Sequence, residues 1–311
     1  MGKTLYKVGN WPRYNRALKD RFRLTVLVTE EVVCGWYAAP SGKRGRPRRY
    51  SDLAIEFVLT LRVLFNLPLR GCEGFAGDVL RLLGLDLECP DYTTLSRRGK
   101  TLDVILPRVR EGGRIFLVVD ASGLKIYGEG EWKARTHGIS TRRAWRKLHI
   151  GLDPETGEIV TAALSTEDAH DSEMLPDLLS GMDGAVRAVV GDGGYDTRGS
   201  YDAISGIGAD AVIPPRKGAK IWRHGNRKDP PHARDENLRY IRMHGRKKWK
   251  EESGYHRRSL AETAFSRIKT IFGDRLRSRD FDNQATEAFL RLSVLNRMTA
   301  LGMPDSYPAS N

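Results

Sequence analysis

Apolar positions in the first hundred residues recur at intervals of three or four, as in helices that bury one face. This pattern predicts helices over residues 30–37, 52–65, 69–83 and 92–98. Ser51 stands where its hydroxyl can cap the second of them. The last three of these helices, of which the final one ends in the basic pair Arg97 and Arg98, are compatible with a helix-turn-helix domain that binds DNA. A plain helical bundle with a charged exterior fits this pattern at least as well.

From about residue 112 the pattern changes to short apolar runs separated by turn residues. Strands are expected over residues 115–119, 145–152, 159–164, 185–190 and 209–213, and helices over 172–182, 198–207 and 283–301. The run 124–127 is expected to pair back on the first strand, and residues 153–157 read as the turn of a hairpin. Hairpins followed by strand-helix alternation predict an α/β fold with helices flanking a mixed sheet.

The charge of the chain narrows the class of partner. Its 311 residues include 52 Lys and Arg against 39 Asp and Glu, a net charge of +13. Much of this surplus lies in residues 216–258, with fifteen Lys and Arg against five Asp and Glu. A concentrated positive field favours a polyanion, most often nucleic acid. An acidic membrane surface, or a basic protein with no such partner, is the alternative.

Membrane and secretory classes are not indicated. We find no apolar run long enough to span a bilayer, and the first residues lack the apolar segment of a signal peptide. Cys34, Cys72 and Cys89 are odd in number and form no Cys-x-x-Cys pair, which argues for a reducing compartment and against structural zinc. We therefore expect a cytoplasmic protein that does not bind membranes.

Two acidic residues, Asp120 and Asp192, each follow an apolar run that reads as a strand. Adjacent strands would bring the two carboxylates together at the edge where such sheets bind ligands. Glu262, on a helix running to about residue 272, would add a third carboxylate. Oxygen ligands suit Mg²⁺ or Mn²⁺, and two such ions can promote phosphoryl displacement. For either aspartate alone, turn chemistry at a strand end is the competing explanation.

Glu262 also belongs to a second pattern. At about 100° per residue, Tyr255, Arg258, Glu262 and Lys269 fall within an arc of roughly 60° on one helix. A tyrosine and two cations beside a carboxylate suit a site that holds a phosphate backbone next to a metal ion. In the alternative interpretation, Ser259 and Glu262 form a capping box and the two earlier residues precede the helix.

The order Asp120, Asp192, Glu262, with Glu262 inside the spacing Tyr-x2-Arg-x3-Glu-x6-Lys, resembles the DDE transposases of bacterial insertion sequences. The likeness is to the branch with the Tyr-Arg-Glu-Lys signature, and within it to insertion-sequence family five. Further segments look like that family: residues 10–15, 45–47, 89–92, 123–125, 128–132, 145–149 and 211–216. The resemblance therefore extends over essentially the whole chain.

The resemblance implies an RNase H-like catalytic domain over residues 111–311, with a basic insertion at about 216–254, after a helical DNA-end-binding domain over residues 1–110. The three acids would bind two Mg²⁺ or Mn²⁺ ions per active site. The enzyme would bind double-stranded DNA at its terminal inverted repeats, cut there and join the 3′-hydroxyl to target DNA, as a homodimer on the ends. A silent DNA-binding protein that kept the scaffold is the alternative.

The resemblance also implies which residues contact DNA. Tyr255, Arg258 and Lys269 would hold the terminal phosphates, and the N-terminal region up to about residue 100 would recognise the ends. Further candidate contacts are Arg46, Arg97, Arg98 and Trp249. Trp249, like Trp222, lies in the basic stretch and could stack on an unpaired base. Ordinary packing is the competing explanation for both tryptophans.

Overall fold

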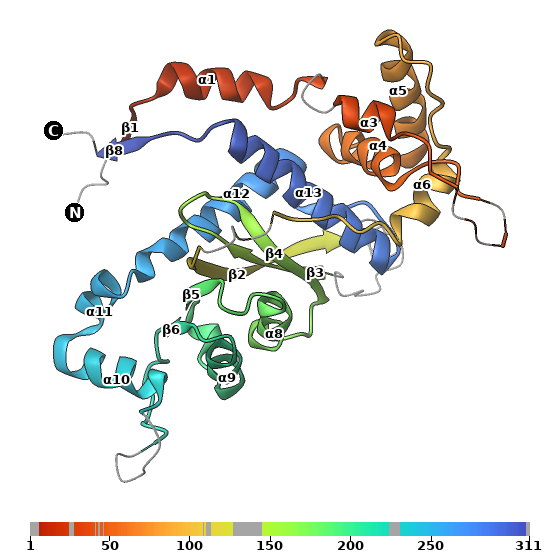
Figure 1. Ribbon diagram of the computed structural model, residues 1–311. Coiled ribbons are helices and arrows are strands. Elements are labelled where there is room, and N and C mark those ends of the chain that lie inside the picture. Colours follow the sequence, from red (N-terminus) through yellow and green to blue (C-terminus); the bar gives the residue numbers. More distant parts are fainter. Residues whose placement is uncertain are drawn as a thin grey trace, which may run out of the picture. The chain divides into compact units, whose positions relative to one another are not determined.

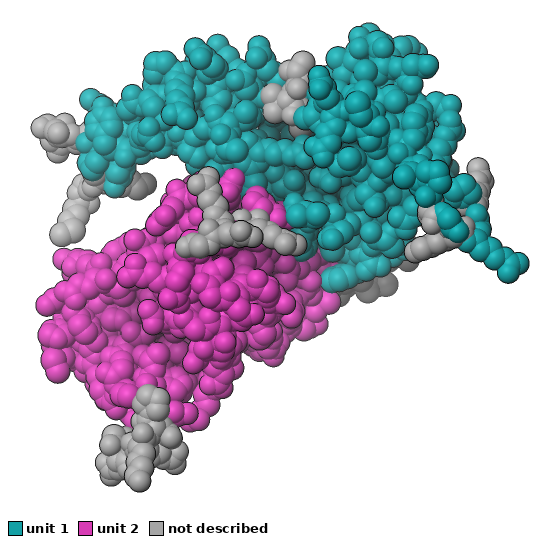
Figure 2. All heavy atoms as spheres, in the orientation of Figure 1, with its two compact units in different colours: residues 1–105, 280–311 teal, residues 106–279 magenta. Residues whose placement is uncertain are grey.

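A computed structural model describes residues 6–24, 28–40, 42, 44–45, 47–107, 109, 113–126, 145–223 and 231–308. The chain divides into two compact units, unit 1 with residues 1–105 and 280–311 and unit 2 with residues 106–279 (Figure 2). Within the described ranges, no helix is both long enough and apolar enough to cross a membrane.

Unit 1 is mostly helical. Its helices are α1 (Trp11–Asp20), α3 (Glu30–Cys34), α4 (Asp52–Leu64), α5 (Leu69–Leu82), α6 (Tyr92–Gly99) and α13 (Phe281–Leu301) (Figure 1). Strands β1 (Tyr6–Val8) and β8 (Ser306–Pro308) pair antiparallel. The predicted cap of α4 is confirmed, because the Ser51 hydroxyl accepts from the Ala54 N–H at 3.2 Å. The other predicted helices are present, with α3 ending three residues early at Cys34.

The C-terminal helix belongs to unit 1. α13 packs on α4, α6 and α1, and Thr286 in α13 donates to the Gly99 carbonyl at 2.6 Å. Its large buried apolar side chains are Leu290, Leu292, Val294, Leu295 and Met298. The resemblance placed this helix in the catalytic domain, whereas its contacts group it with the N-terminal helices.

Unit 2 is built on a mixed sheet, as predicted. The strands are β2 (Ile115–Ile126), β3 (Trp145–Leu152), β4 (Ile159–Thr166), β5 (Val186–Val190), β6 (Asp210–Val212) and β7 (Arg275–Leu276). Their order is β4-β3-β2-β5-β6, with β7 paired to the end of β2. β3 pairs antiparallel with both β2 and β4, whereas β5 and β7 pair in parallel with β2, and β6 pairs in parallel with β5. The predicted hairpin is β3 and β4.

The prediction that the first strand ends at Asp120 is wrong. β2 continues to Ile126, so the run at 124–126 extends this strand instead of pairing back on it. The physical reason is pairing: β3 lies beside β2 from Val118 to Lys125, which gives the small residues 121–123 a partner. Gly123 also faces the Trp145 ring, where an added Cβ would lie 3.0 Å from a ring carbon.

Helices cover both faces of this sheet. α8 (Leu175–Leu179) and α9 (Arg198–Gly206) pack on the face that carries Leu117 and Val119. Val118 and Val190 point to the opposite face, where they meet Trp249 of α11 (Arg246–Glu252) and Ala261 of α12 (Ser259–Phe272). α10 (Ala233–His244) precedes α11 in the basic stretch. Alternation along each strand thus decides which residues face α12.

The Tyr-Arg-Glu-Lys residues do not all share one α-helix. Tyr255 and Arg258 lie in a 3₁₀ turn, η3 (Tyr255–Arg258), which leads directly into α12. Three residues make one turn of such a helix, so these two side chains still emerge on the same side. The alternative capping box is not found either: α12 begins at Ser259 with Arg258 as its N-cap, and the Ser259 hydroxyl donates to the His256 carbonyl instead of accepting from the first turn.

Candidate active site

The two aspartates stand at equivalent points of adjacent strands. β2 and β5 pair in parallel with Val118 opposite Val190. Two residues further on, Asp120 within β2 is level with Asp192, the second residue after the end of β5. Side chains two residues apart share a face, so both carboxylates belong to the face covered by α12. The predicted approach of these acids therefore follows from strand register.

Backbone amides orient each aspartate. The Ala121 N–H donates to Asp120 Oδ1 at 3.0 Å. The Gly194 N–H donates to Asp192 Oδ1 at 2.7 Å, which makes Asp192 the cap of a short 3₁₀ turn, η2 (Gly193–Tyr195). A Cβ on Gly194 would lie 2.8 Å from this carboxylate oxygen, so glycine permits the close approach.

Glu262 is linked to this pair through Arg258. The Arg258 guanidinium lies 3.5 Å from Asp120 Oδ2, and its other terminal nitrogen forms an ion pair with Glu262 one helical turn later. The Glu262 side chain is 57 % exposed and that of Asp120 only 17 %. A cation of the chain itself thus connects a half-buried strand carboxylate with an exposed helix carboxylate.

The pKa values show that the acids share one electrostatic environment. Burial raises the pKa of Asp120, the Ala121 N–H and Arg258 lower it, and the charges of Asp192 and Glu262 raise it further. Burial likewise raises the pKa of the Tyr255 phenol. Arg258 lowers this pKa, and the charges of all three acids raise it. Tyr255 therefore adjoins the same cluster of charges.

Lys269 of α12 contacts β2, the strand that carries Asp120. Its ammonium donates to Ser122 Oγ at 2.7 Å, from a position seven residues after Glu262 in α12. Ser122 is two residues beyond Asp120 in β2 and shares its face. The structure thus brings all four residues of the sequence pattern to one side of the sheet.

The chemistry of the acids fits a divalent metal ion, although they do not form a closed cage. Within the described ranges, no three His, Cys, Asp or Glu side chains converge closely enough to hold a metal ion. The acids nevertheless offer only oxygen ligands, which Mg²⁺ and Mn²⁺ prefer. Burial and mutual repulsion raise the pKa of Asp120, so a cation at this place would be stabilised.

The remaining predicted DNA contacts are placed differently. Trp249 is only 4 % exposed, and its indole N–H donates to Asn237 Oδ1 at 3.0 Å. The ring packs in the cluster of Val118, Val190 and Ala261, as the alternative of ordinary packing predicts. Trp222 packs against the buried apolar cluster that includes Tyr201 and Ile204 of α9. Arg46 lies outside the described residues.

Arg97 and Arg98 border a cleft in unit 1. The cleft has a volume of about 570 Å³, and its lining includes Arg48 and Arg49. Arg98 is largely committed to the fold, because it donates to the Tyr50 carbonyl at 2.8 Å and pairs with Asp52 at 2.5 Å. Arg97 is exposed and donates to the Thr94 hydroxyl at 3.3 Å. The two neighbouring arginines thus have different surroundings.

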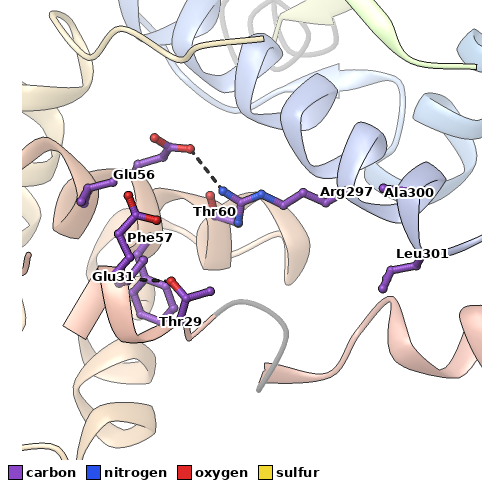
Figure 3. Close-up of a pocket in the computed structure, with 10 residues that line it drawn as sticks. Thr29, Glu31, Glu56, Phe57, Thr60, Arg297, Ala300 and Leu301 are labelled. Atoms are coloured by element: carbon purple, nitrogen blue, oxygen red, sulfur yellow. Dashed lines mark hydrogen bonds and ion pairs between the residues drawn. The ribbon is translucent and has the colours of Figure 1, made fainter. Parts of the chain in front are cut away.

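A separate pocket of about 390 Å³ lies among α3, α4 and α13 (Figure 3). Glu56 and Arg297 point toward each other across it, 3.6 Å apart. Burial raises the pKa of Glu56 and the arginine lowers it. None of the residues singled out from the sequence lines this pocket.

Sequence reasoning missed a buried ion pair next to Asp192. Asp196 and Arg234 are 1 % and 5 % exposed, with Arg234 Nε 2.6 Å from Asp196 Oδ1. The only hint was that Asp196 follows Asp192 by four residues. Arg234 was counted among the surface charges of the basic stretch, because a charge count does not distinguish buried residues from exposed ones.

The chain thus combines a mixed sheet flanked by helices with acids on adjacent strands, and its sequence was compared with known proteins. A family model described as a transposase DDE domain matches residues 111–297, and another with this description matches residues 19–129. The first covers more than half of the chain, which therefore belongs to the DDE transposase family. The chain is also similar to an uncharacterized protein of Aquifex aeolicus (strain VF5), at 24 % identity over 308 residues, 91 % of this chain and 88 % of that protein.

Proposed function

We propose that the protein is the transposase of an insertion sequence of family five, with an RNase H-like core. It binds the terminal inverted repeats, cleaves the DNA there and transfers the freed 3′-hydroxyl strands to target DNA in the bacterial cytoplasm. The observation that carries the proposal is that Asp120 shares Arg258 with Glu262 and feels the charges of both Asp192 and Glu262, in a chain of the DDE family. Because two ends must be joined, we propose a dimer on DNA.

In this proposal the three acids hold two Mg²⁺ or Mn²⁺ ions. When bound, such ions supply Lewis-acid activation of the attacking oxygen and stabilise the charge on the leaving oxygen. The charges of Asp192 and Glu262, which raise the pKa of Asp120, support this assignment, since neighbouring carboxylates favour a cation between them. Arg258, which pairs with Asp120 and Glu262, adds positive charge at the same place.

Tyr255 and Lys269 are proposed to hold the DNA end beside the acids. The phenol adjoins the three carboxylates, and the lysine lies along the strand at Ser122. A phosphate backbone laid along α12 would meet the phenol, Arg258 and the ammonium in turn. Charge-assisted hydrogen bonds of this kind position DNA without reading its sequence.

Lys269→Ala is expected to weaken binding of end DNA about fivefold and to lower the salt slope of log K by about 0.9, because one phosphate contact is lost. The measurement is a titration of labelled end DNA at several salt concentrations. Arg198→Ala removes an exposed arginine of α9, on the face of the sheet opposite α12, and serves as the control. An unchanged slope for Lys269→Ala would make this residue an ordinary surface charge.

The cleft of unit 1 is proposed to take part in recognition of the ends, as expected for a helix-turn-helix region. Arg97→Ala should weaken end binding about fivefold at unchanged stability, since its side chain is exposed. Arg98→Ala should instead lower the free energy of unfolding by about 1–2 kcal/mol through lost bonds to Tyr50 and Asp52. Binding titrations and urea unfolding separate the two effects. Equal behaviour of both variants would refute this division of roles.

The decisive experiment is cleavage of a labelled duplex that carries the DNA flanking the gene. The full chain should nick this duplex at the end of the element when Mg²⁺ is present and leave it intact with a chelator. Binding without cleavage, under conditions where a matched active transposase cuts, would favour the alternative of a silent DNA-binding protein. Failure to bind the flanking DNA at all would reject both readings.

A further inference from the structure

A buried ion pair joins the loop that carries Asp192 to the start of α10. Arg234 donates from Nε to Asp196 Oδ1 at 2.6 Å and from Nη2 to Asp196 Oδ2 at 3.2 Å. This two-point contact fixes the guanidinium plane against the carboxylate. Asp196 ends the short turn η2 that Asp192 begins, so the pair holds the far end of this turn.

The same pair holds the first residues of the basic stretch. Asp196 Oδ2 also accepts from the Arg216 N–H at 2.9 Å, and Arg234 donates to the Lys220 carbonyl at 2.8 Å. The guanidinium of Arg234 lies 3.9 Å from the centre of the Trp222 ring, a cation–π contact. Two buried side chains therefore tie residues 216–222 to the Asp192 loop.

Arg216 completes the connection from the solvent side. Its side chain is exposed and donates to the Gly193 carbonyl at 3.1 Å and to the Gly194 carbonyl at 3.5 Å. Gly194 is the residue whose N–H orients the Asp192 carboxylate. A short series of hydrogen bonds thus leads from Asp192 through η2 to Arg234.

Stability alone is a poor reason for such an arrangement. A buried ion pair loses much of its attraction to desolvation, and apolar side chains of similar volume often stabilise a core as well. What the pair supplies is a fixed geometry, since few other placements satisfy a buried carboxylate that accepts from two side-chain nitrogens and one amide.

We propose that Asp196, Arg216 and Arg234 form a clamp that positions Asp192 for metal binding and anchors the basic stretch beside it. We call these three residues the Asp192 clamp. They are positioning residues, since they act through the η2 backbone on the Asp192 carboxylate. The inference rests on the proposed function, in which Asp192 is a metal ligand. Loss of such outer contacts typically weakens metal affinity about 10- to 100-fold.

The test is Mn²⁺ binding to the full chain without DNA, measured by calorimetry. Asp196→Asn, Arg234→Lys and Arg216→Met should each bind Mn²⁺ at least about tenfold more weakly than the wild type. The controls are Asp202→Asn on the exposed side of α9 and Arg239→Lys in the exposed ion pair of α10. Both should bind within about twofold of the wild type, which excludes a general effect of charge.

The outcomes separate the clamp from the function on which it rests. If the wild type binds Mn²⁺ and the clamp variants bind equally well, the clamp is refuted and the proposed function stands. If the wild type binds no Mn²⁺, both are overturned. Circular dichroism identifies variants that fail to fold. Should Asp196→Asn or Arg234→Lys fail, Arg216→Met decides, because this exposed side chain contacts only loop carbonyls among the described residues.

Discussion

Asp120→Asn, Asp192→Asn and Glu262→Gln are each expected to reduce Mg²⁺-dependent cleavage of end DNA by about 1,000-fold or more. Each change removes the charge of a proposed metal ligand at nearly constant volume, and metal ions contribute several kcal/mol to transition-state stabilisation in such displacements. Binding of end DNA should remain within a few-fold of the wild type, because the acids do not attract phosphates. Single-turnover cleavage and a binding titration on the same DNA measure the two quantities.

A matched variant makes this comparison specific. Asp177→Asn removes an exposed carboxylate of α8 and should cleave at the rate of the wild type. Asp120→Cys should recover part of the lost activity with Mn²⁺ rather than Mg²⁺, since a thiolate is a poor ligand for the harder ion. If any one of the three acid variants keeps near-normal cleavage, that residue does not belong to the catalytic set.

Removal of α13 is expected to unfold unit 1, so a fragment ending near residue 105 should lack a cooperative thermal transition. The helix contributes Leu290, Leu292, Val294, Leu295 and Met298 to the buried core. Each such side chain stabilises the fold by about 1.5–3 kcal/mol. Together they rival the whole stability of a typical domain, about 5–15 kcal/mol.

The corresponding experiment compares two fragments by circular dichroism. Residues 1–105 alone should melt without cooperativity, whereas residues 1–105 joined to 280–311 through a flexible linker should melt cooperatively and bind end DNA. A fusion with serine at Leu290, Leu292 and Leu295 is the control and should behave like the shorter fragment. Cooperative folding and DNA binding by residues 1–105 alone would show that α13 is dispensable.

Local features of the sequence determined most of the elements. The helix expected at 69–83 is found as Leu69–Leu82, because helical periodicity and caps depend on neighbouring residues. The strand at 185–190 is found as Val186–Val190, because an apolar run followed by glycine needs little context. Two such strands, each leading to an aspartate, sufficed to predict that Asp120 and Asp192 lie together.

The sequence did not predict the secondary structure correctly where contacts with distant segments compete with local preferences. The small residues 121–123 indicated a turn, yet pairing with β3 keeps β2 extended through them. Tyr255 and Arg258 fit an α-helical face, yet the chain forms a 3₁₀ turn there. In both cases the side chains still lie on nearly the expected side of the sheet, because the local spacing keeps them on one face even though the secondary structure differs.

The sequence by itself determined the family, the acids that end or continue the apolar strands, and the position of the positive charge. Tertiary structure alone decided that Arg258 joins Asp120 to Glu262, that Asp196 and Arg234 are buried together, and that α13 completes the N-terminal unit. The physical reason is that burial and ion pairing depend on which distant segments meet. A residue's type and spacing reveal what it can do, and the packing around it decides whether it pairs, binds or remains in solvent.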